Sequence, residues 1–230
     1  MSGGGTVSAN RRREPGPASS GPRIAIIDYG MGNLRSAEKA LERSGARPHI
    51  TNDHGAIRAS DGAVLPGVGA FPKAMRNIRE LELDGVIGEL LAGGMPMLGI
   101  CLGMQLLFET TTENEGGWGL GLLSGKVERL PAPGLKVPHI GWNVVRWERR
   151  TPLVEDLPDE CPFYFVHSFA PVGVSREDVL GTSSYGEPFV CAVEREPVYG
   201  VQFHPEKSSV HGLRLLRNFT SICASVGAAS

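Results

Sequence analysis

Short, uninterrupted apolar runs alternate with helical patterns over the first half of this chain. The runs stand at 23–28, 63–65 and 97–100, with a weaker one at 48–51. A strand that is apolar on both sides must be covered on both faces, and a strand–helix–strand order places consecutive strands in parallel. The pattern therefore predicts the α/β fold class, with a central mixed, largely parallel sheet and helices on both faces.

Helical patterns fill the intervals between these runs. Asn33 stands where a cap of the first helix is expected, and Gly45 stands where that helix should stop. We predict helices over 33–44, over 70–92 with a break near Asp84-Gly85, over 102–109 and over 209–224.

From about residue 124 the pattern changes to strands with short connections. We expect these strands at 124–130, 139–147, 162–169, 179–184, 188–194 and 198–203. No linker separates them from the first half, so they are predicted to form an antiparallel extension packed on the same core. Residues 23–230 are then a single domain.

Residues 1–22 have a different composition. They contain five Gly, three Pro, several Ser and no apolar periodicity, which predicts a disordered N-terminal extension. No apolar segment follows its basic residues, so it lacks the pattern of a secretory signal peptide. The run Arg11-Arg12-Arg13 is interpreted as part of a solvated tail.

Charge and cysteine content exclude several classes of function. The 23 Lys and Arg nearly balance the 25 Asp and Glu, which argues against nucleic acid as a partner. No apolar stretch approaches the roughly 18 residues of a membrane span, so no membrane partner is expected. The 4 cysteines form no CxxC pair, which predicts neither a metal site nor a disulfide framework and favours a cytoplasmic location. Three of them are predicted to be buried, unreactive thiols: Cys161, Cys191 and Cys223.

The remaining cysteine, Cys101, stands at the end of an apolar run. The segment Gly99-Ile100-Cys101-Leu102-Gly103 has the pattern of a nucleophile elbow, in which a strand turns sharply into a helix and glycines permit close backbone approach. A sulfur at a helix N-terminus is favoured as a thiolate, and the backbone N–H groups there can stabilise an oxyanion. Taken alone, the segment fits a buried cysteine beside packing glycines equally well.

A base for this cysteine follows a hundred residues later. The apolar strand 198–203 ends at His204-Pro205-Glu206. An imidazole can take the thiol proton and later give it to a leaving group, and a nearby carboxylate holds the imidazole in place. Cys101, His204 and Glu206 are therefore predicted to form a catalytic triad.

These residues resemble a known family. The segments 99–105 (GICLGMQ) and 200–206 (GVQFHPE) are similar to the two signature motifs of class I, triad-type glutamine amidotransferases. The resemblance implies a flavodoxin-like fold and a glutaminase reaction in which Cys101 attacks the side-chain amide of glutamine, with no cofactor and no metal. It also implies an oxyanion hole at Gly67, Val68 and Leu102, and glutamine-binding positions at Gly67, Gln105, His167, Ser168 and Phe169.

Three further segments narrow the resemblance. Residues 28–33 (DYGMGN), 138–143 (PHIGWN) and 163–169 (FYFVHSF) resemble the glutaminase subunits of imidazole glycerol phosphate synthases. That resemblance implies a heterodimer with a separate (β/α)₈ cyclase, which uses the ammonia to convert the nucleotide PRFAR into imidazole glycerol phosphate and AICAR. It also implies that three residues of this chain face the cyclase: Asn33, Trp142 and Lys207.

Two alternatives stay open at this point. The first is a glutaminase subunit of another triad amidotransferase, serving anthranilate or GMP synthesis, although 28–33 and 138–143 argue against it. The second is a binding or regulatory module with a decayed site, although Cys101, His204 and Glu206 are intact.

One position departs from the family pattern, and one loop suggests regulation. Where the family more often has Tyr, this chain has Phe169, and we expect a modest effect because the implied contact with glutamine is through the backbone. Gly67 and Gly69 flank the peptide of the implied oxyanion donor and permit it to flip. We therefore expect the isolated chain to be nearly inactive until a partner aligns this donor.

Overall fold

The computed structural model describes residues 21–227, so the predicted extension lies almost entirely outside the described residues. Its last two residues, Gly21 and Pro22, are held beside strand β2 (Arg47–Thr51). The carbonyl of Pro22 accepts the backbone N–H of Arg47 at 2.8 Å, and the carbonyl of Gly21 accepts its Nε at 2.7 Å. The division into an extension and one domain stays a prediction.

Within these residues, nine strands form one sheet in the order β2-β1-β3-β4-β13-β12-β11-β8-β9. The pairings from β2 to β13 are parallel, and those from β13 to β9 are antiparallel. The bounds of the other strands are β1 (Arg23–Ile27), β3 (Gly62–Gly67), β4 (Met97–Cys101), β13 (Val198–Val201), β12 (Glu187–Arg195), β11 (Val179–Tyr185), β8 (His139–Trp147) and β9 (Glu160–His167). The mixed sheet is confirmed, and its antiparallel extension continues the same sheet.

A second, smaller sheet was not predicted. Its order is β10-β7-β5-β6, and its strands are β10 (Phe169–Val172), β7 (Leu123–Arg129), β5 (Phe108–Thr111) and β6 (Gly117–Trp118). The prediction of a helix over 102–109 is wrong, because helix α5 (Leu102–Gln105) ends early and β5 follows it. The run 102–108 is buried throughout and has no polar face, so its periodicity does not separate a helix from a strand.

The longer helices were predicted, with corrections at their ends. They are α1 (Leu34–Arg43), α3 (Phe71–Glu80), α4 (Leu83–Ala92) and α6 (Ser209–Gly227). The break between α3 and α4 lies at Glu82, in the left-handed region with φ 53°, and not at Asp84-Gly85. Asn33 occupies the N-cap position of α1, but its side chain makes no capping hydrogen bond, because its backbone (φ −89°, ψ 66°) is not the extended conformation that capping uses. The short helix α2 (His54–Arg58), capped by Asp53, was missed.

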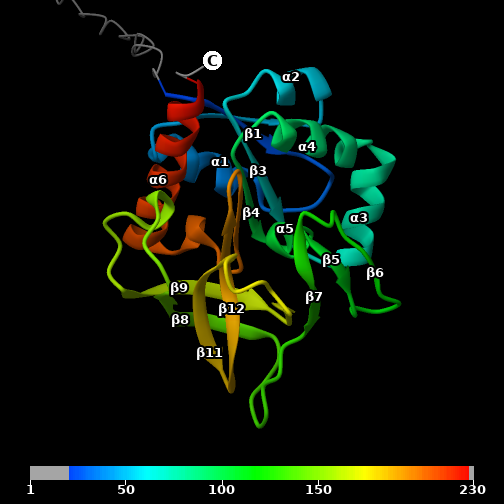
Figure 1. Cartoon of the computed structure of the whole chain (residues 1–230), viewed down its shortest axis with the longest axis vertical. Coiled ribbons are helices and arrows are strands. Elements are labelled where there is room, and N and C mark those ends of the chain that lie inside the picture. Colours follow the sequence, from blue (N-terminus) through cyan, green and yellow to red (C-terminus); the bar gives the residue numbers. More distant parts are fainter. Residues whose placement is uncertain (1–20, 228–230) are drawn as a thin grey trace, which may run out of the picture.

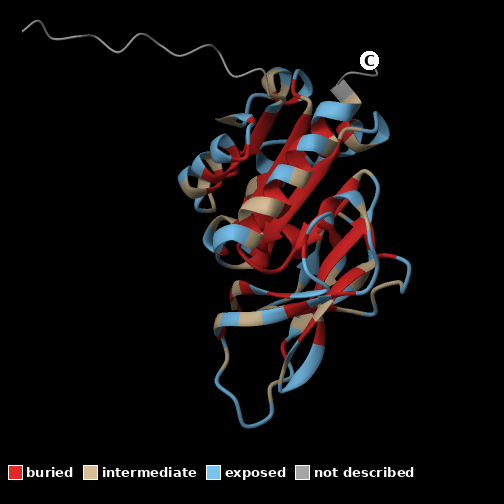
Figure 2. Cartoon of the chain, turned by 90° about the vertical axis from the view of Figure 1, so that its left-hand side faces the viewer, coloured by how far each residue is buried: buried red, intermediate tan, exposed pale blue. Residues whose placement is uncertain are grey.

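Two hydrophobic clusters cover the two faces of the parallel strands. One joins α1 and α6 to the sheet, and the other joins α2, α3, α4 and α5. In β1, Ile24 and Ile26 face the first cluster while Ala25 and Ile27 face the second. Figure 1 shows α6 on one side of the strands and α3 and α4 on the other, and Figure 2 shows the buried strands between them. Burial on both faces explains the uninterrupted apolar runs.

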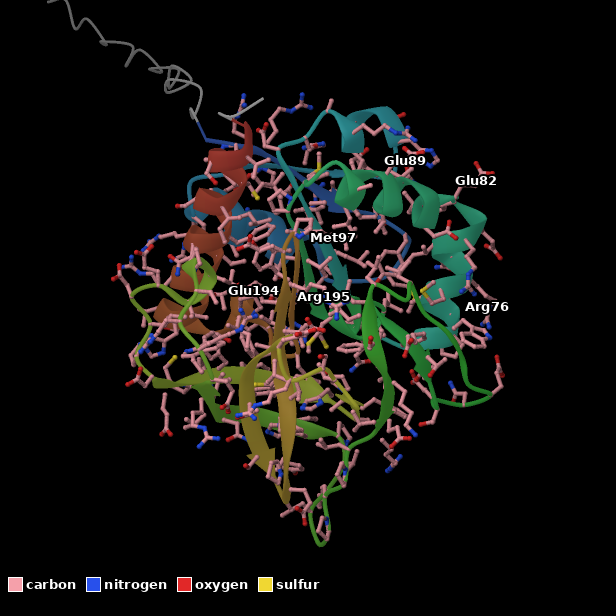
Figure 3. All side chains as sticks on the ribbon, viewed as in Figure 1. Arg76, Glu82, Glu89, Met97, Glu194 and Arg195 are labelled. Carbon is pink, nitrogen blue, oxygen red and sulfur yellow. The ribbon has the colours of Figure 1, made fainter. Side chains whose placement is uncertain are left out.

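The ends of three adjacent parallel strands define where the site lies. The register places Gly67 of β3 beside Cys101 of β4, and Ile100 beside Val201 of β13. Met97 lies at the other end of β4 from Cys101; Figure 3 labels it, together with Glu194 and Arg195 of β12. The side chains predicted to be catalytic therefore lie at the carboxyl edge of the parallel strands, where ligands of such sheets bind.

All four cysteines are buried and free, as predicted for Cys161, Cys191 and Cys223. In the part of the chain that the structure describes, none of the helices has the length and apolarity needed to cross a bilayer.

The turn after Cys101 gives a stability prediction. A Cβ added to Gly103 would lie 1.7 Å from the carbonyl oxygen of Leu65 in β3, so Gly103→Ala must separate two backbone segments. We expect it to lower the free energy of unfolding by about 3 kcal/mol in urea denaturation. The matched control is Gly88→Ala in α4, where a Cβ meets open space; it should raise stability by up to about 1 kcal/mol. Equal effects of the two variants would contradict the close approach.

Candidate active site

Cys101 lies at the sharp junction of β4 and α5. Its backbone has φ 56° and ψ −112°, a conformation that costs a residue other than glycine about 1–3 kcal/mol. Gly99 and Gly103 allow the turn, because a Cβ on Gly99 would lie 2.7 Å from the carbonyl oxygen of Gly103. The geometry is that of a nucleophile elbow, with the sulfur at the start of a helix.

His204 lies three residues beyond the end of β13, and Glu206 lies in the short 3₁₀ helix η2 (Pro205–Lys207). The two side chains are joined by a hydrogen bond of 2.8 Å from His204 Nδ1 to Glu206 Oε1, and each is only 4% exposed. The turn itself is fixed by Ser208, whose hydroxyl donates to the carbonyl of His204 at 2.6 Å and accepts the N–H of Tyr164 at 2.9 Å.

The electrostatics of His204 link the three predicted catalytic residues. Burial alone lowers the pKa of His204, but its hydrogen bonds with Cys101 and Glu206, and their negative charges, outweigh burial and raise this pKa to about 9. The imidazole is therefore protonated at neutral pH, beside the sulfur. An imidazolium beside a cysteine sulfur is an arrangement that can activate the cysteine for attack on a carbonyl carbon.

A cavity of about 340 Å³ opens beside the Cys101 sulfur. Most of the residues that were predicted to bind glutamine or an oxyanion line it: Val68, Leu102, Gln105, His167, Ser168 and Phe169. Gly67 lies behind this wall, on a second and smaller pocket that it shares with Asn33, His204 and Glu206. The site is thus built from two sides, with the parallel strand ends facing the 166–169 segment.

The residue before Gly67 is anchored by a buried tyrosine. The hydroxyl of Tyr29 donates to the carbonyl of Pro66 at 2.7 Å, and a Cβ on Gly67 would lie 2.3 Å from that hydroxyl oxygen. Burial, and then the charge of Cys101, raise the pKa of Tyr29, so it remains a neutral donor. Val68 follows with a side chain 43% exposed, at the rim of the cavity.

Glu113 is a cavity residue that sequence reasoning missed. Its carboxylate accepts the backbone N–H of Phe71 at 2.8 Å, which holds it at the wall. It stands in the polar loop after β5, in a run of threonines, glutamates and glycines that carries no recognisable motif. An acidic side chain in such a loop is usually a solvated surface group, so only the folded chain reveals its place.

The three residues expected at a partner interface are exposed. Trp142 is 55% exposed, and on the same side of β8 it is flanked by Ile140 and Val144, which are 60% and 48% exposed. Lys207 lies at the cavity beside His204, and Asn33 is exposed at the start of α1. A Trp at this position could instead be a core aromatic, and the exposure of Trp142 does not agree with that interpretation.

Among residues 21–227, His, Cys, Asp and Glu side chains do not gather in groups of three or more that could hold an ion.

Comparison with known proteins identifies the class. The family model described as glutamine amidotransferase class-I matches residues 25–223. Together with the elbow and the buried His204–Glu206 pair, this match means that the chain belongs to the class I glutamine amidotransferase family.

Within that family, two relatives with the same name illustrate the similarity. The chain is 51% identical over 204 residues to imidazole glycerol phosphate synthase subunit HisH of Moorella thermoacetica, with 89% of this chain and 97% of that protein covered. It is 48% identical over 203 residues to the protein of the same name from Methanosarcina barkeri, covering 87% and 99%.

Solved structures agree at the level of the fold. A glutamine amidotransferase from Thermotoga maritima has a TM-score of 0.58 at 19% identity, covering 80% of this chain and 76% of that one. PurLQS from the same organism has a TM-score of 0.70 at 20% identity, covering 88% and 99%. These similarities confirm the predicted fold class.

The raised pKa of His204 can be tested by titration. In Glu206→Gln the carboxylate charge and its strong hydrogen bond are lost, so the imidazolium is less stable and the pKa of His204 should fall from about 9 by a unit or more. The measurement is NMR titration of the His204 ring. Glu42→Gln, which removes an equal charge from an exposed site on α1, is the control and should leave the midpoint unchanged. An unshifted midpoint in Glu206→Gln would show that Glu206 does not set this pKa.

Proposed function

We propose that this chain is the glutaminase subunit of an imidazole glycerol phosphate synthase, which hydrolyses glutamine and passes the ammonia to a separate cyclase. The observation that carries the proposal is the buried hydrogen bond between His204 and Glu206 beside Cys101, at the wall of a ligand-sized cavity. The relatives named HisH, at about half identity over nearly their whole length, support this function over the anthranilate or GMP alternative.

In the proposed reaction, the Cys101 thiolate attacks the side-chain carboxamide carbon of glutamine. A carbon–sulfur bond forms, and the electron pair of the C=O bond moves to the oxygen. The oxyanion hole is proposed to consist of the N–H of Leu102, at the first position of α5, and the Gly67-Val68 segment. The exposed position of Val68 at the cavity rim supports this placement.

The tetrahedral intermediate then collapses with proton transfer. His204 donates its proton to the amide nitrogen, the carbon–nitrogen bond breaks, and ammonia leaves a Cys101 thioester. A water molecule then loses a proton to His204 and attacks the thioester, which releases glutamate and restores the thiolate. Glu206 holds the imidazole in orientation and stabilises its protonated form throughout.

The cavity residues are proposed to hold the substrate. Gln105 and the 167–169 segment lie along the cavity where the extended part of glutamine would run. Glu113 supplies a negative charge that suits the α-ammonium group.

The cyclase is proposed to dock over the face that carries Asn33, Trp142 and Lys207, forming a heterodimer in the cytoplasm. An exposed Trp flanked by Ile140 and Val144 gives this face a large apolar anchor. Lys207 lies both on this face and at the cavity, so a cyclase bound here would cover the place where ammonia is released.

A coupled assay tests the proposal. The chain is mixed with PRFAR and the separate cyclase, and glutamine-dependent formation of imidazole glycerol phosphate is measured. Cys101→Ala should abolish turnover with glutamine and leave turnover with ammonium salts, because only the glutaminase step needs the thiolate. Cys161→Ala, which removes a different buried thiol, is the control and should keep glutamine-dependent turnover. Loss of the ammonia-dependent reaction in Cys101→Ala would contradict the proposal that this chain only supplies ammonia. Strong glutaminase activity of the chain without the cyclase would contradict the expected dependence on the partner.

The role of Glu113 gives a second test. Glu113→Gln keeps an acceptor for the N–H of Phe71 but removes the charge, so KM for glutamine should rise about tenfold or more while kcat changes less than about threefold. Glu115→Gln, in the same loop and exposed, is the matched control and should leave KM unchanged. An unaltered KM in Glu113→Gln would place the α-ammonium group elsewhere.

A further inference from the structure

A buried amide that is not part of the cavity wall contacts the Cys101 sulfur. Gln202 is fully buried, and its Nε2 lies 3.8 Å from Cys101 Sγ, within hydrogen-bond distance for sulfur. Its Oε1 accepts a hydrogen bond from Nε2 of Gln105 at 3.0 Å. The proposed mechanism does not use Gln202.

The hydrogen bonds continue from Gln105 into the antiparallel half of the sheet. Gln105 Nε2 also donates to the carbonyl of Phe169 at 3.0 Å. The same carbonyl is 2.9 Å from His167 Nδ1, and His167 Nε2 is 3.0 Å from His139 Nδ1. His139 is stacked between the rings of Phe165 and Tyr185, at centroid distances of 5.0 and 4.1 Å.

The chemistry of the partners fixes the direction of every bond. A carbonyl only accepts, so Nδ1 of His167 carries its hydrogen and Nε2 is free to accept from His139. His139 then donates from Nδ1, and its Nε2 accepts from Asn143 Nδ2 at 3.4 Å. Burial lowers the pKa of both imidazoles, that of His167 to about 4, so both remain neutral near pH 7.

Matching donors to acceptors in the same way sets the orientation of the Gln202 amide. Nε2 of Gln105 only donates, so it must meet the oxygen of Gln202, and the amino group of Gln202 is left facing the sulfur. If the Gln202 amide were rotated by 180°, two donors would meet at Gln105 and an oxygen would face the sulfur. When only one arrangement gives every buried polar atom a hydrogen-bond partner, the network holds its side chains in that arrangement.

We propose that Gln202 is a further catalytic residue, whose side-chain N–H donates to the Cys101 thiolate, and that Gln105 and the His139–His167 pair position its amide. A thiol can donate its own hydrogen to the carbonyl of Val166, which lies 3.7 Å from Sγ. A thiolate can only accept, so the Gln202 donor stabilises the reactive form selectively. The proposal rests on the proposed function only in taking the thiolate as the attacking species.

The groups that influence the sulfur are known from the structure. His204 is its hydrogen-bonded base, Tyr29 interacts with its charge, and the cavity adds three titratable side chains: Glu113, His167 and Lys207. Substitution of Gln202 leaves all of them in place. A change in the titration of Cys101 in such a variant is therefore assigned to the lost donor.

The test is the pH dependence of Cys101 alkylation by iodoacetamide, followed by mass spectrometry of the Cys101 peptide. In Gln202→Met, which keeps the size of the side chain, the apparent pKa of alkylation should rise by about one unit, so the rate at pH 7 falls about tenfold. Gln202→Glu places an oxygen beside the sulfur and should shift the midpoint further. Thr220→Val, which removes a buried hydrogen bond in α6, is the control and should not shift it.

The positioning residues have a separate readout. His139→Phe keeps a stacked ring but removes the donor to His167, and it should raise the same midpoint by a smaller amount. An unchanged midpoint in His139→Phe would remove the histidine pair from the proposal. An unchanged midpoint in folded Gln202→Met would overturn it altogether.

A measurement on the unsubstituted protein covers the case in which these variants do not fold. The side-chain amide resonances of Gln202 should titrate with the midpoint of Cys101 alkylation, and resonances that stay fixed would overturn the proposal. Glutaminase activity of the unsubstituted heterodimer is measured in parallel. Absence of that activity would count against the proposed function, whereas the alkylation profile would still decide the role of Gln202.

Discussion

The parallel hydrogen-bond ladder of β3, β4 and β13 is the constraint on which the site depends. It sets Gly67 beside Cys101 and Ile100 beside Val201, so residues far apart in the sequence end at one edge of the sheet. Neither neighbour of β4 can slide by a residue without turning its buried side chains to the wrong face. This ladder also offsets the strained backbone of Cys101, because the strand that leads into it is buried on both faces.

The antiparallel half of the sheet supplies the opposite wall of the site. Strand β9 and the following segment bring His167 and Phe169 to the cavity, and β8 brings His139 behind them. The other surface of β8 is exposed and apolar around Trp142. One strand thus supports the hydrogen bonds around Cys101 from inside and presents exposed apolar side chains outside, so the docking proposed for this face would bring the partner close to the site.

The strands of the parallel half, the elbow at Cys101 and the nearby His204 and Glu206 could be predicted from the sequence, because each carries a strong local signal. Apolar runs mark strands buried on two faces, and the glycines around Cys101 mark a close backbone approach. The end of α5 and the start of β5 were not predictable, because a fully buried run looks the same in either conformation.

The positions of buried polar side chains were beyond sequence reasoning for a different reason. Glu113 has no motif, and the motif that contains Gln202 does not report its contacts. Each side chain acquires its place from partners distant in the sequence. Their roles become clear only when the folded structure shows which donor meets which acceptor.

Gln105 shows how such a count bears on selectivity. Both hydrogens of its amide are used inside the protein, one by the carbonyl of Phe169 and one by Gln202. Gln105 lines the cavity, and the side-chain atom that it has left for a ligand is an oxygen, which accepts from an N–H and repels a carboxylate. This position of the cavity wall therefore favours ligands that bring a hydrogen-bond donor to it over ligands that bring a negative charge.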